Sequence, residues 1–416
     1  MSTQRPGRAV VTGIGVIAPN GLRADAYWKS VREGLGVLGR ISREGCEDLP
    51  LKVAGQVEGF DASDLIDERF LVQTDRFTHY AMAAAALALD DAGLGHDDNP
   101  EEPFSIGVVT AAGSGGGEFG QRELQKLWGQ GSKFVGPYQS IAWFYAASTG
   151  QISIRHGFKG PCGVVASDEA GGLDSLAHAA RAVRRGTGAV VVGAAEAPLA
   201  PYSMVCQLGY PELSTVEDPD RAYRPFTAKA CGFVPAEGGA MLVVEDEARA
   251  LDRGATVRAT IAGHGATFTG ASRWKESREG LARAIRVALD EAGCAPEEID
   301  VVFPDALGVP EADRAEALAI ADVLGAHATR VPVTAPKTGY GRAYCGAPVL
   351  DVTAAVFAME HGLVPPTPNV FDIDCDIDVV MSRARPAELR TALVLSRGLM
   401  GSNAALVVRR GGGLAR

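Results

Sequence analysis

The sequence repeats part of itself, and this repeat limits the possible fold more than any single motif does. Ala-Leu-Asp-Asp-Ala-Gly at residues 88–93 recurs as Ala-Leu-Asp-Glu-Ala-Gly at residues 288–293. Each copy ends a helical pattern that precedes a strand, and its glycine stands where a left-handed helix C-cap is wanted. We therefore expect two similar halves, residues 1–250 and 251–416, related by a pseudo-twofold axis. Chance recurrence in an alanine-rich chain is the alternative.

Two kinds of pattern alternate along the chain. Short runs rich in Val and Ala predict strands, and apolar residues spaced near 3.6 predict helices. This order is typical of an α/β protein whose sheets are covered by helices. The predicted strands are 9–17, 106–110, 189–193, 240–245, 301–303, 392–396 and 404–408, and the predicted helices are 77–92, 171–185, 278–292, 312–324 and 346–361.

Charge and composition exclude several classes of protein. The formal net charge of −11 and the lack of any run of Lys and Arg argue against a general nucleic-acid binder. No apolar stretch approaches the roughly 18 residues that cross a bilayer, and the first residues do not resemble a signal peptide. The seven cysteines include no CxxC pair. We expect a cytoplasmic protein with no membrane association and no metal ion.

Two glycine-rich segments suggest a nucleotide site at first sight. Residues 13–18 fit the dinucleotide pattern GxGxxA, but the Pro-Asn-Gly turn at 19–21 follows at once, so no helix N-terminus faces a pyrophosphate. Residues 113–117 lack the Lys-Ser/Thr ending of a phosphate loop. We expect a strand-to-loop turn in the first segment and no cofactor, with a dinucleotide-dependent dehydrogenase as the weaker alternative.

Two further segments are candidate sites. Residues 118–128 have helical composition, and Gly117, Gly120 and Leu124 share one helix face that leaves space beside it. Close packing against another backbone is the alternative use of that space. Residues 164–174 form a strand, a turn and a helix, and the turn displays Glu169 at the helix N-terminus. Simple capping is the alternative there, and no Ser-His-Asp or Cys-His set can be assembled nearby.

These segments lie within a stretch, from residues 10–13 to residues 402–405, over which the whole sequence resembles a known family. Among its specific stretches are residues 143–145, 150–157, 222–226, 234–239 and 336–338. The sequence resembles the chain-length factors, the ketosynthase beta subunits of bacterial type II polyketide synthases, which are similar to active ketosynthases of the thiolase fold. The resemblance implies a duplicated thiolase-like fold with two pseudo-symmetric halves in five layers, α-β-α-β-α.

The resemblance also implies that the reactive groups of an active ketosynthase are absent. The nucleophilic cysteine corresponds to Glu169, where the family usually carries glutamine, and the two catalytic histidines correspond most nearly to Asp305 and Arg342. Glutamate forms no transferable thioester, and the guanidinium of arginine stays charged and shuttles no proton near neutral pH. Glu169, Lys337 and Arg342 could instead form an ion-pair network that fills a vestigial site.

What the resemblance leaves is an architectural function. It implies pairing with a ketosynthase alpha subunit, with a polyketide tunnel between the two subunits and chains delivered as phosphopantetheine thioesters on an acyl carrier protein. The family's gate positions correspond to Gly117, Gly120 and Leu124, and small residues there imply a long tunnel. We expect a non-catalytic subunit that sets the number of malonyl condensations. The alternative is a malonyl-carrier-protein decarboxylase that supplies the primer by means of Glu169.

Overall fold

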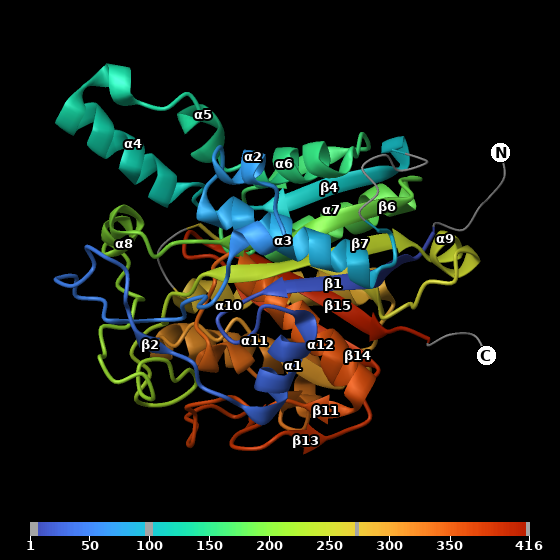
Figure 1. Ribbon diagram of the computed structural model, residues 1–416. Coiled ribbons are helices and arrows are strands. Elements are labelled where there is room, and N and C mark those ends of the chain that lie inside the picture. The colour runs from blue at the N-terminus through green and yellow to red at the C-terminus, as the bar shows by residue number, and fades with distance from the viewer. Residues whose placement is uncertain (1–6, 96–102, 271–273, 413–416) are drawn as a thin grey trace.

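A long twisted sheet organises the computed structural model, which describes residues 7–95, 103–270 and 274–412 (Figure 1). Within these residues the order of the 11 strands is β12-β10-β9-β14-β15-β8-β1-β7-β6-β4-β5. The strands are β1 (Ala9–Ile17), β4 (Ile106–Ala111), β5 (Cys162–Val165), β6 (Ala189–Glu196), β7 (Gly238–Asp246), β8 (Ala259–Phe268), β9 (Val301–Phe303), β10 (Pro332–Val333), β12 (Asp378–Val379), β14 (Thr391–Arg397) and β15 (Ser402–Arg410).

The strand pattern is the same on both sides of the seam between β1 and β8. On one side β1, β7 and β6 pair antiparallel, and β4 and β5 follow in parallel. On the other side β8, β15 and β14 pair antiparallel, and β9 and β10 follow in parallel. The duplication expected from the sequence is therefore confirmed. The division at residues 1–250 and 251–416 stays a prediction.

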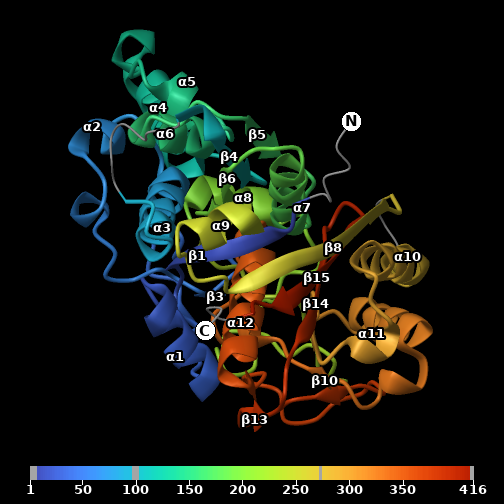
Figure 2. The same cartoon turned by 90° about the vertical axis from the view of Figure 1, so that its right-hand side faces the viewer.

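Helices form three layers around the two halves of the sheet (Figures 1 and 2). Helices α3 (Arg76–Asp91) and α6 (Ala147–His156) cover one outer face, and α10 (Trp274–Ala292) and α11 (Pro310–Leu324) cover the other. Helices α7 (Gly171–Arg184) and α12 (Gly346–His361) contact strands of both halves and form the middle layer. Residues 346–359 of α12 are all buried, as expected of a helix that is apolar all round. The predicted five layers are confirmed.

Close packing explains the glycines of the first candidate motif. Gly13 and Gly15 of β1 lie against α3, and Gly263 and Gly265 of β8 lie against α10. A Cβ on any of the four would overlap a backbone oxygen of the facing helix. The residues that meet these glycines are Ala84 and Ala88 of α3 with its C-cap Ala92, and Ala284, Ala288 and Ala292 of α10. The repeated hexapeptide thus marks the contact that holds each half together, and the glycines that fit a dinucleotide pattern are used for packing.

The sequence-based assignments agree well with the structure. Every predicted strand and helix is present, with ends shifted by no more than a few residues. The helix expected at 118–128 is α4 (Gly117–Gln130), and residues 18–21 form the expected turn. Strand β8 was not predicted, because Gly263, His264 and Gly265 interrupt its apolar pattern.

The remaining elements are α1 (Ala24–Glu33), α2 (Glu68–Leu71), α5 (Gln139–Ala142), α8 (Pro201–Gln207), α9 (Glu247–Asp252), β2 (Gly39–Arg40), β3 (Val53–Ala54), β11 (Leu363–Val364) and β13 (Arg385–Pro386). In the part of the chain that the structure describes, no helix is long and apolar enough to cross a membrane.

The packing contact predicts a stability effect. Replacing Gly265 with Ala forces its Cβ into the backbone of α10, so we expect the free energy of unfolding to fall by about 1–3 kcal/mol. Urea unfolding followed by circular dichroism measures this change. Gly150→Ala is the matched control, because Gly150 is exposed in the middle of α6 with open space around it. Equal stability of the Gly265→Ala variant and the unmodified chain would contradict the packing role.

Candidate functional site

The turn between β5 and α7 places Glu169 inside the protein. Asp168 adopts a left-handed conformation with φ of 58°, which makes the turn sharp. Glu169 is only 3% exposed, and its Oε2 accepts a hydrogen bond from the backbone N–H of Leu399 at 3.0 Å. Burial, together with the neighbouring carboxyl group of Asp168, raises the pKa of Glu169 well above its usual range. The turn between β5 and α7 therefore displays an acid that favours its uncharged form.

Two buried ion pairs occupy the neighbouring positions. Arg342 donates from Nη2 to Oδ1 of Asp305 at 2.9 Å. Lys337 Nζ lies 2.5 Å from Oδ2 of Asp351 on α12. Burial raises the pKa of Asp351 to about 6, although the ammonium group of Lys337 works against this shift. Each buried cation thus has a buried carboxylate beside it, which offsets the cost of removing the charges from water.

The ion-pair network expected among Glu169, Lys337 and Arg342 is not the one that forms. Both cations pair with aspartates, and Glu169 takes part in none of the ion pairs found among the described residues. The physical reason is that Asp305 and Asp351 take the positions beside the two cations, so the charge of Arg342 lowers the pKa of Glu169 by less than burial raises it. Asp351 was missed in the sequence, where a single acidic residue in an otherwise apolar helix was the available signal.

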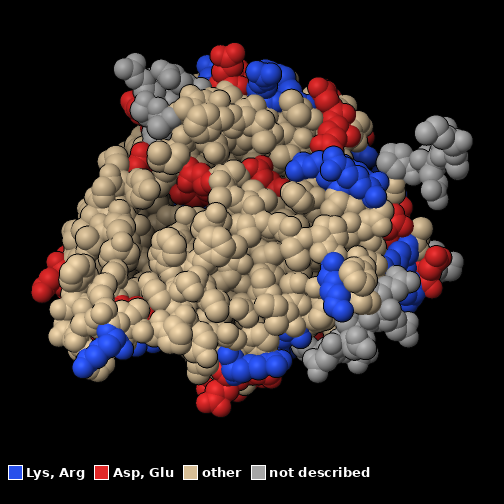
Figure 3. Space-filling model, turned by 90° about the horizontal axis from the view of Figure 1, so that it is seen from above, with Lys and Arg blue, Asp and Glu red and all other residues tan. Residues whose placement is uncertain are grey.

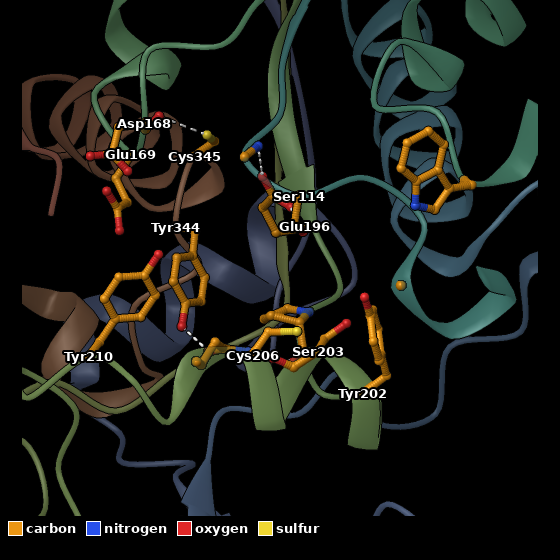
Figure 4. Close-up of a pocket in the computed structure, with 15 residues that line it drawn as sticks. Ser114, Asp168, Glu169, Glu196, Tyr202, Ser203, Cys206, Tyr210, Tyr344 and Cys345 are labelled. Carbon is orange, nitrogen blue, oxygen red and sulfur yellow. Dashed lines mark hydrogen bonds between the residues drawn. The ribbon is translucent and has the colours of Figure 1, made fainter. Parts of the chain in front are cut away.

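Glu169 also lines a pocket of about 310 Å³, shown in Figure 4. A second acid in it, Glu196, ends β6 and is buried. Glu196 accepts hydrogen bonds from the backbone N–H of Gly113 at 2.5 Å and from Ser114 Oγ at 3.3 Å. Burial raises its pKa to about 7. The sequence analysis missed Glu196, although an acid closing an apolar strand was a usable signal. The pocket is lined by Gly113, Ser114, Gly117, Trp143, Asp168, Glu169, Glu196, Pro198, Tyr202, Ser203, Cys206, Gln207, Tyr210, Tyr344 and Cys345.

The lining contains no activated nucleophile of the kind a condensing enzyme needs. The buried thiol of Cys345 donates to the backbone oxygen of Asp168 at 3.1 Å. Burial, with nearby acids adding to the effect, raises the pKa of Cys345 well above its usual range, so it stays a thiol. No histidine lines the pocket. Among the residues that the structure describes, no group of three or more His, Cys, Asp or Glu could hold a metal ion.

The three predicted gate residues all lie on α4, but they have different surroundings. Gly117 lines the pocket. Gly120 is buried, and a Cβ built on it would lie 3.2 Å from Cδ1 of Trp143. Leu124 is exposed on the surface of the helix. The face therefore runs from the pocket, past an aromatic ring, to the outside of the molecule.

The first residues of α3 hold α4 in place. The buried carboxylate of Asp75 accepts from the first turn of α3 through one oxygen and from the backbone N–H of Phe119 in α4, at 2.6 Å, through the other. The next residue, Arg76, donates from Nε to Oε2 of Glu118 at 2.7 Å. One carboxylate thus caps two helices, and an ion pair reinforces the junction. This junction fixes the end of α4 that borders the pocket.

Comparison with known families identifies both halves of the chain. Residues 7–250 match the family model described as Beta-ketoacyl synthase, N-terminal domain, and residues 258–371 match Beta-ketoacyl synthase, C-terminal domain. A protein of Streptomyces coelicolor, whose name describes a polyketide beta-ketoacyl synthase 2, is 73% identical over 404 residues. The match covers 97% of this chain and 95% of the relative.

Solved structures agree with this assignment. The ishigamide ketosynthase/chain length factor matches with a TM-score of 0.88 and 29% identity, over 98% of this chain and 100% of that one. A type II polyketide synthase acyl-carrier protein in complex with its ketosynthase bound to the hexaketide matches with a TM-score of 0.85 and 26% identity, over 98% and 100%. The chain therefore belongs to the beta-ketoacyl synthase family, among the polyketide beta-ketoacyl synthase 2 proteins that include the Streptomyces coelicolor relative.

Proposed function

We propose that this chain is the chain-length-determining subunit of a ketosynthase pair and performs no condensation by itself. The observation that carries the proposal is Glu169, a buried acid in the turn before α7, where the resemblance implies the acyl-accepting cysteine of an active ketosynthase. The chain pairs with a cysteine-containing alpha subunit, and an acyl carrier protein brings malonyl and polyketide chains on its phosphopantetheine. The similarity to a ketosynthase/chain length factor and to a carrier-protein complex supports both partners. The cytoplasmic location expected from the sequence is part of this proposal.

The surface around α4, α5 and α6 supports a protein partner. Helices α4 and α5 project from the body in Figure 1, and Figure 3, which views that side from above, shows a broad area without Lys, Arg, Asp or Glu. The exposed large apolar residues of this region include Trp128, Trp143, Phe144, Tyr145 and Ile154. Monomeric proteins rarely expose large contiguous apolar patches. Strand β5 also ends the sheet, so one of its edges is free for a partner to cover.

The site gives less support to a malonyl-carrier-protein decarboxylase. A malonyl group carries a carboxylate, and a binding site for it needs a cation or several donors. No Lys or Arg lines the pocket, and the malonyl carboxylate would meet Glu169 and Glu196 instead. Arg342 and Lys337 are already paired with Asp305 and Asp351. We therefore favour the length-setting function over primer supply.

The lone chain should form no covalent acyl adduct. After incubation with acetyl- or malonyl-acyl carrier protein, we expect intact-protein mass spectrometry to show an unchanged mass. The reason is that the turn before α7 presents the carboxyl group of Glu169 rather than a thiolate. The alpha subunit treated in the same way is the positive control. A stable acyl adduct on the isolated chain would refute the proposal. Release of carbon dioxide by the lone chain, abolished in Glu169→Ala, would instead favour the decarboxylase.

Enlarging the first gate residue should shorten the product. A side chain on Gly117 would run into Ser203 Oγ, and the ring of a Gly117→Phe variant must then occupy the pocket. We expect products shorter by at least one two-carbon unit from the co-expressed pair, measured by mass spectrometry of extracted polyketides. Gly129→Phe is the control, since Gly129 is an exposed glycine on the same helix with open space around it. Unchanged product length in Gly117→Phe would disprove the gate assignment.

A further inference from the structure

Strand β5 lies at the end of the sheet, between two helices. Its strand partner among the described residues is β4, so its other edge has no strand beside it. Helices α6 and α7 both contact β5 and lie on opposite faces of this end of the sheet (Figure 1). A free strand edge readily pairs with another chain. A partner that pairs with β5 would therefore also meet α6 and α7.

The exposed face of α7 beside β5 is basic. His178, Arg181 and the C-cap Arg185 follow one another at spacings of three and four residues, which places them on one face of the helix, and all three are exposed. A Cβ built on Gly163 of β5 would lie 3.7 Å from the imidazole ring of His178. These three residues, which we call the α7 stripe, therefore border the free strand edge.

The charges of the α7 stripe have no partner within the described chain. Among the residues that the structure describes, neither Arg181 nor Arg185 forms an ion pair, although the protein has a net charge of −11. Asp174, the acid that begins the same helix face, instead has its Oδ1 2.8 Å from Nε2 of His264. Burial, and after it the charges of both guanidinium groups, lowers the pKa of His178, so the surface here has a positive potential. Two cations one helical turn apart repel each other, and their charge is available to another molecule.

Symmetry determines which molecule suits this charge. If two copies of the chain paired through their β5 edges, the interface would be isologous, with each surface against the same surface of the other copy. Antiparallel pairing of the two strands would keep both α7 helices on one face of the joined sheet, so the two stripes would lie close together. Like charges that face each other cost free energy, whereas a partner with carboxylates at these positions gains it. The α7 stripe therefore favours a different, acidic partner over a second copy.

We propose that the α7 stripe directs the choice of partner at the β5 edge: it opposes pairing between two copies of this chain and favours an alpha subunit that places Asp or Glu side chains opposite Arg181 and Arg185. This inference rests on the proposed pairing with a ketosynthase alpha subunit. It adds which charges make the pair a heterodimer.

The test neutralises the stripe and follows two associations. In Arg181→Gln/Arg185→Gln we expect the Kd of the pair with the alpha subunit to rise about tenfold, because ion pairs across the interface are lost. We expect the Kd for self-association of the lone chain to fall about threefold, because the repulsion between two stripes is removed. Sedimentation velocity of the purified subunits measures both constants. A loss of structure would weaken both associations, so opposite changes identify an effect of charge.

Two further variants separate charge from helix structure. Arg181→Lys/Arg185→Lys keeps both charges near the helix C-terminus, where cations also interact favourably with the helix dipole. We expect it to keep both constants near those of the unmodified chain. Arg283→Gln/Arg286→Gln is the matched control, because both arginines are exposed on α10 in the outer layer of the other half. We expect this control to change neither constant.

Three outcomes distinguish this inference from the proposed function. An unchanged Kd for the pair, or no gain in self-association, in Arg181→Gln/Arg185→Gln would overturn the role of the α7 stripe. If the unmodified subunits still pair in that case, the proposed length-setting function stands. If the unmodified chain does not bind the alpha subunit at all, the proposed function fails together with this inference.

Discussion

Two glycine-bearing strands lie in backbone contact with two alanine-bearing helices, and the rest of the architecture depends on this contact. A single methyl group on Gly13 or Gly263 would push the outer helix away from its strand. With both outer helices seated, the two halves of the sheet can enclose α7 and α12 between them. The segments that begin these middle helices then meet, because Glu169 comes just before α7 and Cys345 just before α12. The pocket thus lies where the two middle helices begin, and the duplicated architecture brings these two segments together.

The interior around the pocket follows a consistent electrostatic rule. Arg342 and Lys337 each have a buried aspartate beside them, which balances the two positive charges. Removing one partner of such a buried pair typically costs about 3–5 kcal/mol, because the other charge is left uncompensated. Among the described residues, Glu169 and Glu196 form no ion pair, and burial raises the pKa of both. These buried side chains therefore contribute structure and hydrogen bonding.

The sequence predicted the fold well because the relevant signals are local. Helix and strand periodicity, the repeated hexapeptide and the turn at 19–21 each depend on residues close in the chain. The site was less predictable, since its contacts join distant segments: Leu399 donates to Glu169, and Asp351 pairs with Lys337. Three residues placed on one face by helical spacing, Gly117, Gly120 and Leu124, also proved to have different neighbours. Helical spacing fixes a direction on α4, but only the packing of α5 and α8 determines what lies there.

Glu169 is more similar to a glutamine than the usual charge of a glutamate at neutral pH suggests. A glutamine, which the resemblance implies for chain-length factors at this position, offers an amide donor and a carbonyl acceptor. A protonated glutamate offers an O–H donor and a carbonyl acceptor with nearly the same shape. Because burial favours the uncharged form of Glu169, the pocket keeps its hydrogen-bonding pattern without an anion. A protonated Glu169 can therefore fill the place of a glutamine without leaving a buried charge unpaired, and a protonated carboxyl group is a poor nucleophile for an acyl group.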